Sequence, residues 1–314
     1  MQKFIKSFVF QILFLSLSTY AETTVFTSHG RTFRLVSPSA KYEKRPLLIL
    51  LHGCKQDSQI ILEGTNLETE ALKRDFYILV PEQSSISNSD HCWNWFYSQE
   101  QERNSPEMAS IIQTLENLIL TKNISREKIF VAGLSAGGAL AHSLMNCYPD
   151  YFSAVAIQSG LAYKVAENVF EAQTVLTSTS QKPINYLGTK AAKCSRLPVN
   201  QHRLMKSIIL HGEDDARVDP LHAALISSSN EVRFDILDDG LINRSVKIAM
   251  TQRVESYPHG YSVLITDKTI NNFSERLILI KNMRHAWGGG KPLSSNFDPA
   301  APSTTKFILN YFNL

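Results

Sequence analysis

Hydrophobic residues fall into short continuous runs that are separated by longer amphipathic stretches along most of the chain. Six runs have the length and apolar content of strands buried on both faces: residues 46–51, 76–80, 128–132, 152–157, 207–210 and 276–280. A helical period of apolar residues covers five other stretches: 59–73, 106–120, 136–147, the residues after Pro220, and 304–312. This alternation predicts an α/β fold, a mainly parallel central sheet with helices on both faces. Because no repeat or flexible linker interrupts it, we expect a single domain.

A hairpin precedes the alternation of strands and helices, and two later stretches do not fit it. Residues 24–28 and 32–36 alternate around His29-Gly30, which predicts a hairpin. Residues 163–202 are polar and irregular, and are a candidate cover for a binding site. Residues 231–275 contain two possible extra strands, at 246–254 and 261–266, whose order in the sheet the sequence does not reveal.

The N-terminus has the pattern of a secretory signal peptide. Lys3 and Lys6 precede an apolar core from Phe8 to Leu17, and Thr19 and Ala21 are small residues suited to a cleavage site. A membrane anchor is the weaker alternative, because spanning a bilayer takes about 20 apolar residues. We expect residues 1–21 to be removed, which leaves 22–314 as the single folded domain of a secreted or periplasmic protein.

Composition narrows the class of protein. Of 314 residues, 43% are hydrophobic, which argues against disorder. The formal charge of +3 argues against nucleic acid as the main partner. The four cysteines, an even count in an exported chain, favour disulfides, although spacing alone does not choose among three pairings: Cys54, Cys92, Cys147 and Cys194. No CxxC or HExxH pattern occurs, so no metal site is expected.

The segment Gly133-Leu134-Ser135-Ala136-Gly137 lies between a predicted strand and a predicted helix. In this context the G-x-S-x-G pattern indicates a sharp turn that projects Ser135 above the carboxyl edge of the sheet. The helix that begins at Ala136 directs free N–H groups to the same point, where they can stabilise an oxyanion. An ordinary glycine-rich turn is the alternative. We predict that Ser135 is a nucleophile.

A catalytic serine needs a base, and the base needs an acid to orient it. On this kind of sheet the expected chain order is serine, acid, histidine. The strand at 207–210 is followed by three competing acids, Asp214, Asp215 and Asp219, and the residues alone leave the choice open.

The expected base is His285, in a loop after the strand at 276–280. His222 and His259 also follow the acids, but we expect His222 on a helix surface and His259 in a turn. The backbone N–H of Cys54, after the strand at 46–51, is the expected second oxyanion donor beside that of Ala136. His52 is expected to fix this loop instead of transferring protons.

These residues and their neighbours resemble the secreted polyhydroxybutyrate (PHB) depolymerase-like esterases of the α/β-hydrolase superfamily. The matching stretches occur in the family's order: Leu51-His52-Gly53-Cys54, Pro81-Glu82-Gln83, Cys92-Trp93-Asn94-Trp95-Phe96, 132–138, Ser159-Gly160-Leu161, the D-x-x-V pattern at 215–218, and His285-Ala286-Trp287. The resemblance implies an α/β-hydrolase fold, with Ser135, Asp215 and His285 as the catalytic triad. It also implies an oxyanion hole from the amides of Cys54 and Ala136.

The resemblance further implies a Cys54–Cys92 disulfide, which leaves Cys147–Cys194 as the remaining pair. One departure is Arg284, where the family usually has glycine. Another is that no polymer-binding module follows the last helix, so soluble oligomers or small esters are expected in place of crystalline polymer. Aromatic residues beside the site, Trp93, Trp95 and Trp287, are candidate substrate contacts, with core packing as the alternative.

We therefore expect a serine esterase that works through an acyl-enzyme without metal or cofactor. The expected substrates are PHB oligomers or other short-chain hydroxyalkanoate esters. Feruloyl or acetyl-xylan esterase activity is the near alternative, and a prolyl-type serine peptidase or a non-catalytic binding protein is more distant. The sequence does not reveal the oligomeric state.

Overall fold

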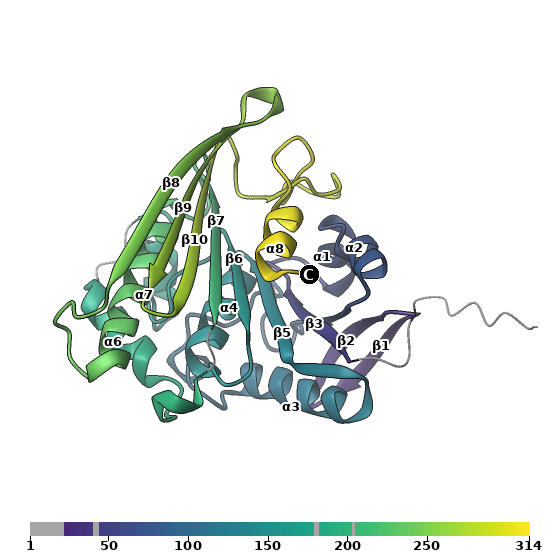
Figure 1. Ribbon diagram of the computed structural model, residues 1–314. Helices are drawn as coiled ribbons and strands as arrows, with labels where there is room; N and C mark the ends of the chain where they lie inside the picture. Colours follow the sequence, from purple (N-terminus) through teal and green to yellow (C-terminus); the bar gives the residue numbers. More distant parts are fainter. Residues whose placement is uncertain (1–21, 40–43, 179–181, 203–204) are drawn as a thin grey trace, which may run out of the picture.

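A sheet of ten strands forms the centre of the computed structural model, which describes residues 22–39, 44–178, 182–202 and 205–314 (Figure 1). In spatial order the strands are β1 (Glu22–Ser28), β2 (Arg31–Ser37), β4 (Tyr77–Pro81), β3 (Arg45–Leu51), β5 (Ile124–Leu134), β6 (Ala154–Gln158), β7 (Lys206–Gly212), β10 (Phe273–Lys281), β9 (Ser262–Ile270) and β8 (Ile248–Ser256). The predicted signal peptide lies outside the described residues.

The six strands from β4 to β10 in this order are mutually parallel, which confirms the predicted sheet. Antiparallel strands complete both edges. The predicted hairpin of β1 and β2 joins β4, and β9 and β8 continue the sheet beyond β10. Because parallel strands end at a common edge, the loops after β3, β5, β6, β7 and β10 converge there.

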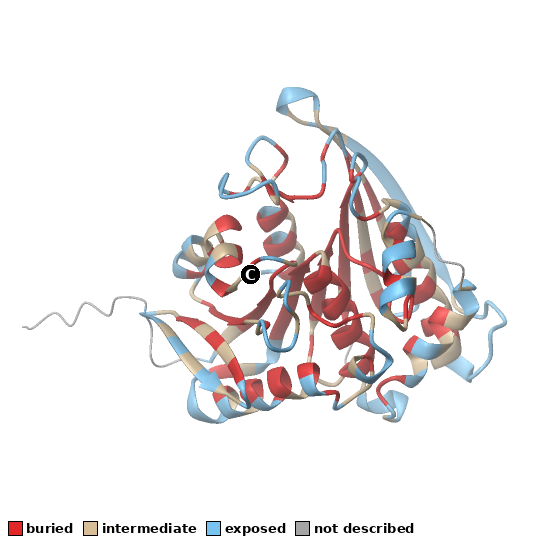
Figure 2. Cartoon of the chain, turned by 180° about the vertical axis from the view of Figure 1, so that it is seen from behind, coloured by how far each residue is buried: buried red, intermediate tan, exposed pale blue. Residues whose placement is uncertain are grey.

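Helices cover both faces of the sheet, as the sequence predicts (Figure 1). One face packs on α1 (Ser58–Gly64), α2 (Leu67–Arg74) and α8 (Thr304–Phe312), and the other on α3 (Pro106–Thr121), α4 (Ala136–Cys147), α6 (Ile184–Lys193) and α7 (Leu221–Asp239). Alternate residues of β3 pack into the cores on opposite faces of the sheet. Ile49 packs on the face covered by α3 and α4, whereas Leu48 and Leu50 pack on the face covered by α1 and α8. Figure 2 shows the buried strands in red and the exposed edge strand β8 in pale blue.

The helix predicted over 59–73 is two helices. The chain breaks at Thr65 and Asn66, and Asn66 adopts a left-handed conformation with φ 59°. Asparagine tolerates this conformation better than most residues, so the break costs little. Gly64, the last residue of α1, packs so closely on Phe297 that a Cβ there would lie 2.1 Å from the ring. The break thus lies at a tight contact with a distant segment, which the local pattern does not reveal.

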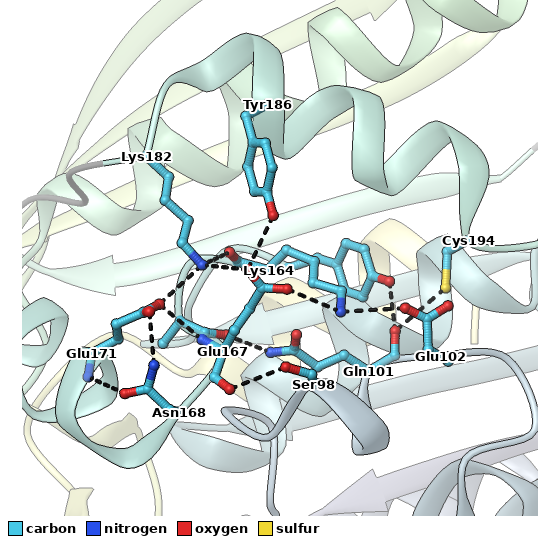
Figure 3. A network of polar contacts seen from close by, with 12 residues as sticks. Ser98, Gln101, Glu102, Lys164, Glu167, Asn168, Glu171, Lys182, Tyr186 and Cys194 are labelled. Atoms are coloured by element: carbon cyan, nitrogen blue, oxygen red, sulfur yellow. Dashed lines mark hydrogen bonds and ion pairs between the residues drawn. The ribbon is translucent and has the colours of Figure 1, made fainter.

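The irregular segment 163–202 contains α5 (Val169–Leu176) and α6, which the sequence analysis did not predict. A polar network ties the start of this segment to the loop around η1 (Ser98–Glu100) (Figure 3). The nearly buried Lys164 ammonium lies 3.3 Å from Glu102 and 3.4 Å from Glu167, and Lys182 lies 2.9 Å from Glu167. The amide of Gln101 donates to the carbonyl of Ala166. Among the described residues, no helix combines the length and apolar character that crossing a bilayer requires.

Candidate active site

Ser135 occupies a sharp turn between β5 and α4. Its backbone has φ 58° and ψ −119°, a strained conformation for a residue other than glycine. The turn is tight, because a Cβ on Gly133 would lie 2.1 Å from the carbonyl oxygen of Gly137, and a Cβ on Gly137 would lie 2.4 Å from that of Leu51. Both glycines therefore permit a backbone approach that a side chain would block, and the strain is held at the predicted nucleophile.

Asp215 and His285 meet at the same edge of the sheet. Asp215 follows β7, His285 follows the parallel strand β10, and His285 Nδ1 lies 2.7 Å from Asp215 Oδ2. The two loops come close because Gly212 has no side chain, and a Cβ there would lie 2.2 Å from the carbonyl oxygen of Met283. That same carbonyl accepts the N–H of Asp214 at 3.0 Å.

The surroundings of Asp215 favour its ionised form. Burial alone would raise the pKa of Asp215, but hydrogen bonds from the rings of His211 and His285 and from the amide of Val218 hold it well below its ordinary value. Asp215 Oδ1 accepts the N–H groups of Arg217 and Val218, each at 2.9 Å. This carboxylate can therefore hold a charged imidazole without taking up its proton.

Asp219, another of the three candidate acids, has a different role in the structure. Asp219 Oδ1 accepts the N–H of Leu221 at 2.9 Å, at the first turn of α7. Asp219 therefore stabilises a helix start, a role that negatively charged side chains often fill.

Of the two other histidines after the acids, His222 differs from expectation and His259 lies in a turn as expected. His222 is buried, with 1% of its surface exposed, and its Nε2 contacts the carbonyl of Val175. The surface position predicted for it is wrong, because α5, which was not predicted, covers this side of α7. His259 is exposed in η3 (Pro258–Gly260), the hairpin between β8 and β9.

His211 is a contact of the site that the sequence analysis did not single out. It is fully buried at the end of β7, and its Nε2 lies 3.2 Å from Asp215 Oδ2 and 3.0 Å from the carbonyl of Val218. The available signal was its position, four residues before the acid and directly after an apolar run. His211 and His285 therefore both contact the same carboxylate oxygen, Asp215 Oδ2.

The loop after β3 lies beside Ser135. A Cβ built on Gly53 would lie 3.4 Å from Ser135 Cβ. Within the described chain, neither the amide of Cys54 nor that of Ala136 donates to another protein atom. Free backbone donors next to a nucleophile can bind the negative oxygen of a tetrahedral intermediate.

Several contacts fix this loop. The disulfide Cys54–Cys92 joins it to the tryptophan-rich segment, and the indole N–H of Trp93 donates to the carbonyl of His52 at 2.9 Å. Gln56, which the sequence analysis overlooked, accepts the N–H of Gly53 at 2.8 Å. The second disulfide, Cys147–Cys194, joins the end of α4 to the end of α6. Both are the pairs that the family resemblance implied.

The ring of His52 has the fixing role expected of it. Its Nδ1 lies 2.8 Å from the carbonyl of Gly53, and its Nε2 accepts the N–H of Gln83 at 3.0 Å. Both ring nitrogens are used by a neutral imidazole, and burial lowers the pKa of His52 to about 4. His52 is therefore neutral and unsuited to accept a proton at neutral pH.

The three tryptophans proposed as substrate contacts are packing residues in this structure. Trp93 and Trp287 have no exposed surface, and Trp95 is 6% exposed. The indole N–H of Trp287 donates to Thr305 Oγ1 at 2.9 Å, within the core beneath α8. With their faces covered, Trp93 and Trp287 offer no surface to a bound ester, and core packing, the stated alternative, describes them better.

Residues 32–255 match the family described as Esterase PHB depolymerase. The chain belongs to this family. It is 33% identical over 167 residues to poly(3-hydroxyalkanoate) depolymerase C of Paucimonas lemoignei, and 29% identical over 122 residues to feruloyl esterase B of Thermothelomyces thermophilus. These alignments cover 52% and 38% of the chain, and only 40% and 41% of the two relatives.

The fold of this family member is also that of a solved esterase. Acetyl xylan esterase from Aspergillus awamori superposes with a TM-score of 0.72, over 93% of this chain and 99% of that one. The two sequences are 15% identical in the superposition, so the likeness concerns the α/β-hydrolase fold.

Proposed function

We propose that this chain is a serine carboxylic ester hydrolase in which Ser135, His285 and Asp215 form the catalytic triad. The observation that carries the proposal is the 2.7 Å hydrogen bond between His285 and Asp215, at the sheet edge where Ser135 occupies its strained turn. Family membership supports the same reaction class.

In the proposed mechanism, ionised Asp215 accepts the Nδ1–H of His285, which leaves Nε2 free to remove the proton of Ser135. The Ser135 oxygen then attacks the ester carbonyl, and the amides of Cys54 and Ala136 bind the oxygen that becomes negative. His285 gives the proton to the departing alcohol. Water, activated by the same imidazole, releases the acid from the acyl-enzyme.

For the substrate, we propose oligomers of 3-hydroxybutyrate or related short-chain hydroxyalkanoate esters. The family match and the relative from Paucimonas lemoignei support this choice. A feruloyl or acetyl-xylan ester is the second candidate, which the relative from Thermothelomyces thermophilus favours.

We also propose that the protein is exported and that cleavage follows Ala21. Two disulfides support an oxidising compartment. Cleavage there would leave Glu22, the first residue of β1, as the new N-terminus. N-terminal sequencing of protein recovered from a secreting host checks this, and a mature chain that begins inside β1 would contradict it.

Ser135→Ala tests the nucleophile. Hydrolysis of p-nitrophenyl butyrate by the purified protein should fall by at least about 10³-fold, because no other hydroxyl occupies the turn. Ser143→Ala is the matched control, since Ser143 donates to the carbonyl of Ala139 within α4 and should leave the rate nearly unchanged. Equal rates for the Ser135 variant and the control would refute the assignment.

A substrate panel tests the ester class. We expect the highest kcat/KM for 3-hydroxybutyrate oligomers, compared with methyl ferulate, acetylated xylan and a prolyl anilide. A preference for ferulate or xylan acetyl groups would favour the second candidate. Preference for the anilide would make the protein a peptidase.

A further inference from the structure

Arg233 is a buried cation that has no counterion among the described residues. It lies on α7 with 1% of its surface exposed, and its Nε and Nη1 have no hydrogen-bond partner. Within the described chain, no carboxylate pairs with it. Burying a charge without a partner costs free energy, so such a group usually has a function or a missing ligand.

Other buried cations of the chain do have partners. Arg31 donates to Ser110, to Gln83 and to the carbonyl of Glu82, each at 2.9 Å. Lys164 lies between two glutamates. Arg233 therefore differs from buried cations whose hydrogen bonds or ion pairs the fold itself supplies.

Arg233 lines a cavity of about 190 Å³ between α7 and the turn that joins β9 to β10. The walls nearby are apolar, since Ile270 is fully buried and the rings of Phe234 and Phe273 stack with their centroids 4.1 Å apart. The Arg233 guanidinium carbon lies 4.7 Å from the centroid of the Phe234 ring. His202 also lines the cavity, and its Nδ1 has no partner.

The mouth of the cavity is polar. Asp238 and Asn272 are exposed there, and Asp238 accepts the hydroxyl of Ser245 at 3.3 Å. One buried cation with apolar walls matches a ligand with one negative charge and an apolar body, because a single guanidinium pairs with a single carboxylate. A multiply charged anion such as phosphate would meet one guanidinium and the repulsion of Asp238.

We propose that this cavity is a binding site for a small organic monocarboxylate, whose carboxylate pairs with Arg233 and whose apolar part packs on Phe234, Ile270 and Phe273. Its volume is below the roughly 300 Å³ of drug-sized pockets, so the ligand is small. Burial lowers the pKa of Arg233 to about 10, and the side chain therefore stays protonated at neutral pH.

This site is remote from the proposed active site. Phe273 begins β10, whereas His285 follows its other end. With nine residues in β10 and about 3.3 Å per residue, the two ends lie roughly 25 Å apart. In Figure 1 the β9–β10 turn lies at the bottom of the sheet, opposite the hairpin of β8 and β9. The proposal does not depend on the esterase reaction.

Calorimetric titration of the purified protein with sodium benzoate tests the proposal. We expect saturable 1:1 binding, and at least tenfold weaker binding of neutral benzamide and of inorganic phosphate. Arg233→Met should weaken benzoate binding at least tenfold, while the exposed arginine variant Arg244→Met, with the same change of net charge, should not. Asn272→Glu, at an exposed turn, should also weaken binding, and it remains informative if the Arg233 variant fails to fold.

Several outcomes would overturn the proposal: no saturable binding of benzoate, equal affinities for the Arg233 and Arg244 variants, or affinity insensitive to Asn272→Glu. Loss of benzoate binding on covalent modification of Ser135 would place the ligand in the active site instead. Ester hydrolysis by Arg233→Met should equal that of the unsubstituted protein. This readout separates failure of the carboxylate site from failure of the proposed function.

Discussion

Four groups donate hydrogen bonds to the carboxylate of Asp215, or contact it: the rings of His211 and His285 and the amides of Arg217 and Val218. Such a carboxylate has a fixed position and a fixed charge. Orientation of the imidazole, which is the acid's proposed task, depends on both.

We predict that Asp215→Asn lowers kcat for p-nitrophenyl butyrate by about 10⁴-fold, because an amide holds the wrong tautomer of His285. Asp219→Asn should change kcat little and cost at most about 1 kcal/mol of stability, since Asp219 accepts the N–H of Leu221, the first residue of α7. Steady-state kinetics and urea unfolding measure the two effects. A large loss of activity in the Asp219 variant alone would move the acid to that position.

At the scale of elements, the two disulfides have different surroundings. Cys54–Cys92 restrains the loop that carries a proposed oxyanion donor, whereas Cys147–Cys194 joins α4 to α6 across a sequence separation of 47. The first should therefore affect catalysis, and the second stability.

Replacing Cys147 and Cys194 with alanine should lower the free energy of unfolding by about 2–4 kcal/mol and leave kcat nearly intact. Replacing Cys54 and Cys92 should lower kcat by roughly tenfold or more, because one oxyanion donor loses its fixed position. Thermal unfolding and esterase kinetics on both double variants test the distinction. Equal losses of kcat in the two would argue against a special role for the loop.

The helices and strands that were predicted correctly from the sequence are those that a single local pattern of apolar residues determines. The strands of the parallel sheet are continuous apolar runs, and such runs have few alternatives in a chain that alternates with helices. Helices α5 and α6 were missed because their stability depends on neighbours such as the network of Lys164 and the packing of Gly188 against Val232. Helix α5 in turn buries His222, so one missed element produced a second error.

For the candidate site too, only the part that depends on a local motif could be predicted from the residues alone. The turn at Ser135 is a local motif, but the choice of Asp215 needed the family resemblance. The contact of His211 with Asp215 needed the three-dimensional arrangement of the β7 end. For the tryptophans the sequence left substrate contact and core packing open, because a large aromatic residue next to a site in sequence fits a core as well as a pocket.

At the scale of the whole molecule, two buried histidines link stability to pH. His142 Nδ1 accepts the N–H of Tyr163 at 2.9 Å, and its Nε2 lies 3.2 Å from Asn230 Oδ1. Like His52, it is satisfied in the neutral form, and burial lowers the pKa of each to about 4 from an ordinary 6.5. Burial raises the pKa of Glu107 to about 7, which acts in the opposite direction.

We predict that the free energy of unfolding falls as pH decreases from 6.5 towards 4. The unfolded chain then takes up protons at His52 and His142 that the folded chain does not, and each contributes at most about 3 kcal/mol. Above pH 6.5 this stabilisation is fully present. Glu107 offsets part of the slope between pH 4.5 and 7, because its folded form binds the extra proton.

Urea unfolding at several pH values measures this dependence. His142→Gln should reduce the slope by up to one proton, about 1.4 kcal/mol per pH unit. The exposed histidine variant His259→Gln should leave it unchanged. An unaltered slope in the His142 variant would mean that this ring also titrates in the folded protein.

The position of β10 between β7 and β9 has a consequence for how the protein is made. β10 can pair with β7 and β9 only after more than sixty residues beyond β7 have left the ribosome. Those residues form α7, β8 and β9. The nucleophile and the acid are synthesised well before the proposed base. A chain whose translation has not passed β10 therefore contains the proposed nucleophile and acid but lacks the proposed base, and we expect it to hydrolyse no ester.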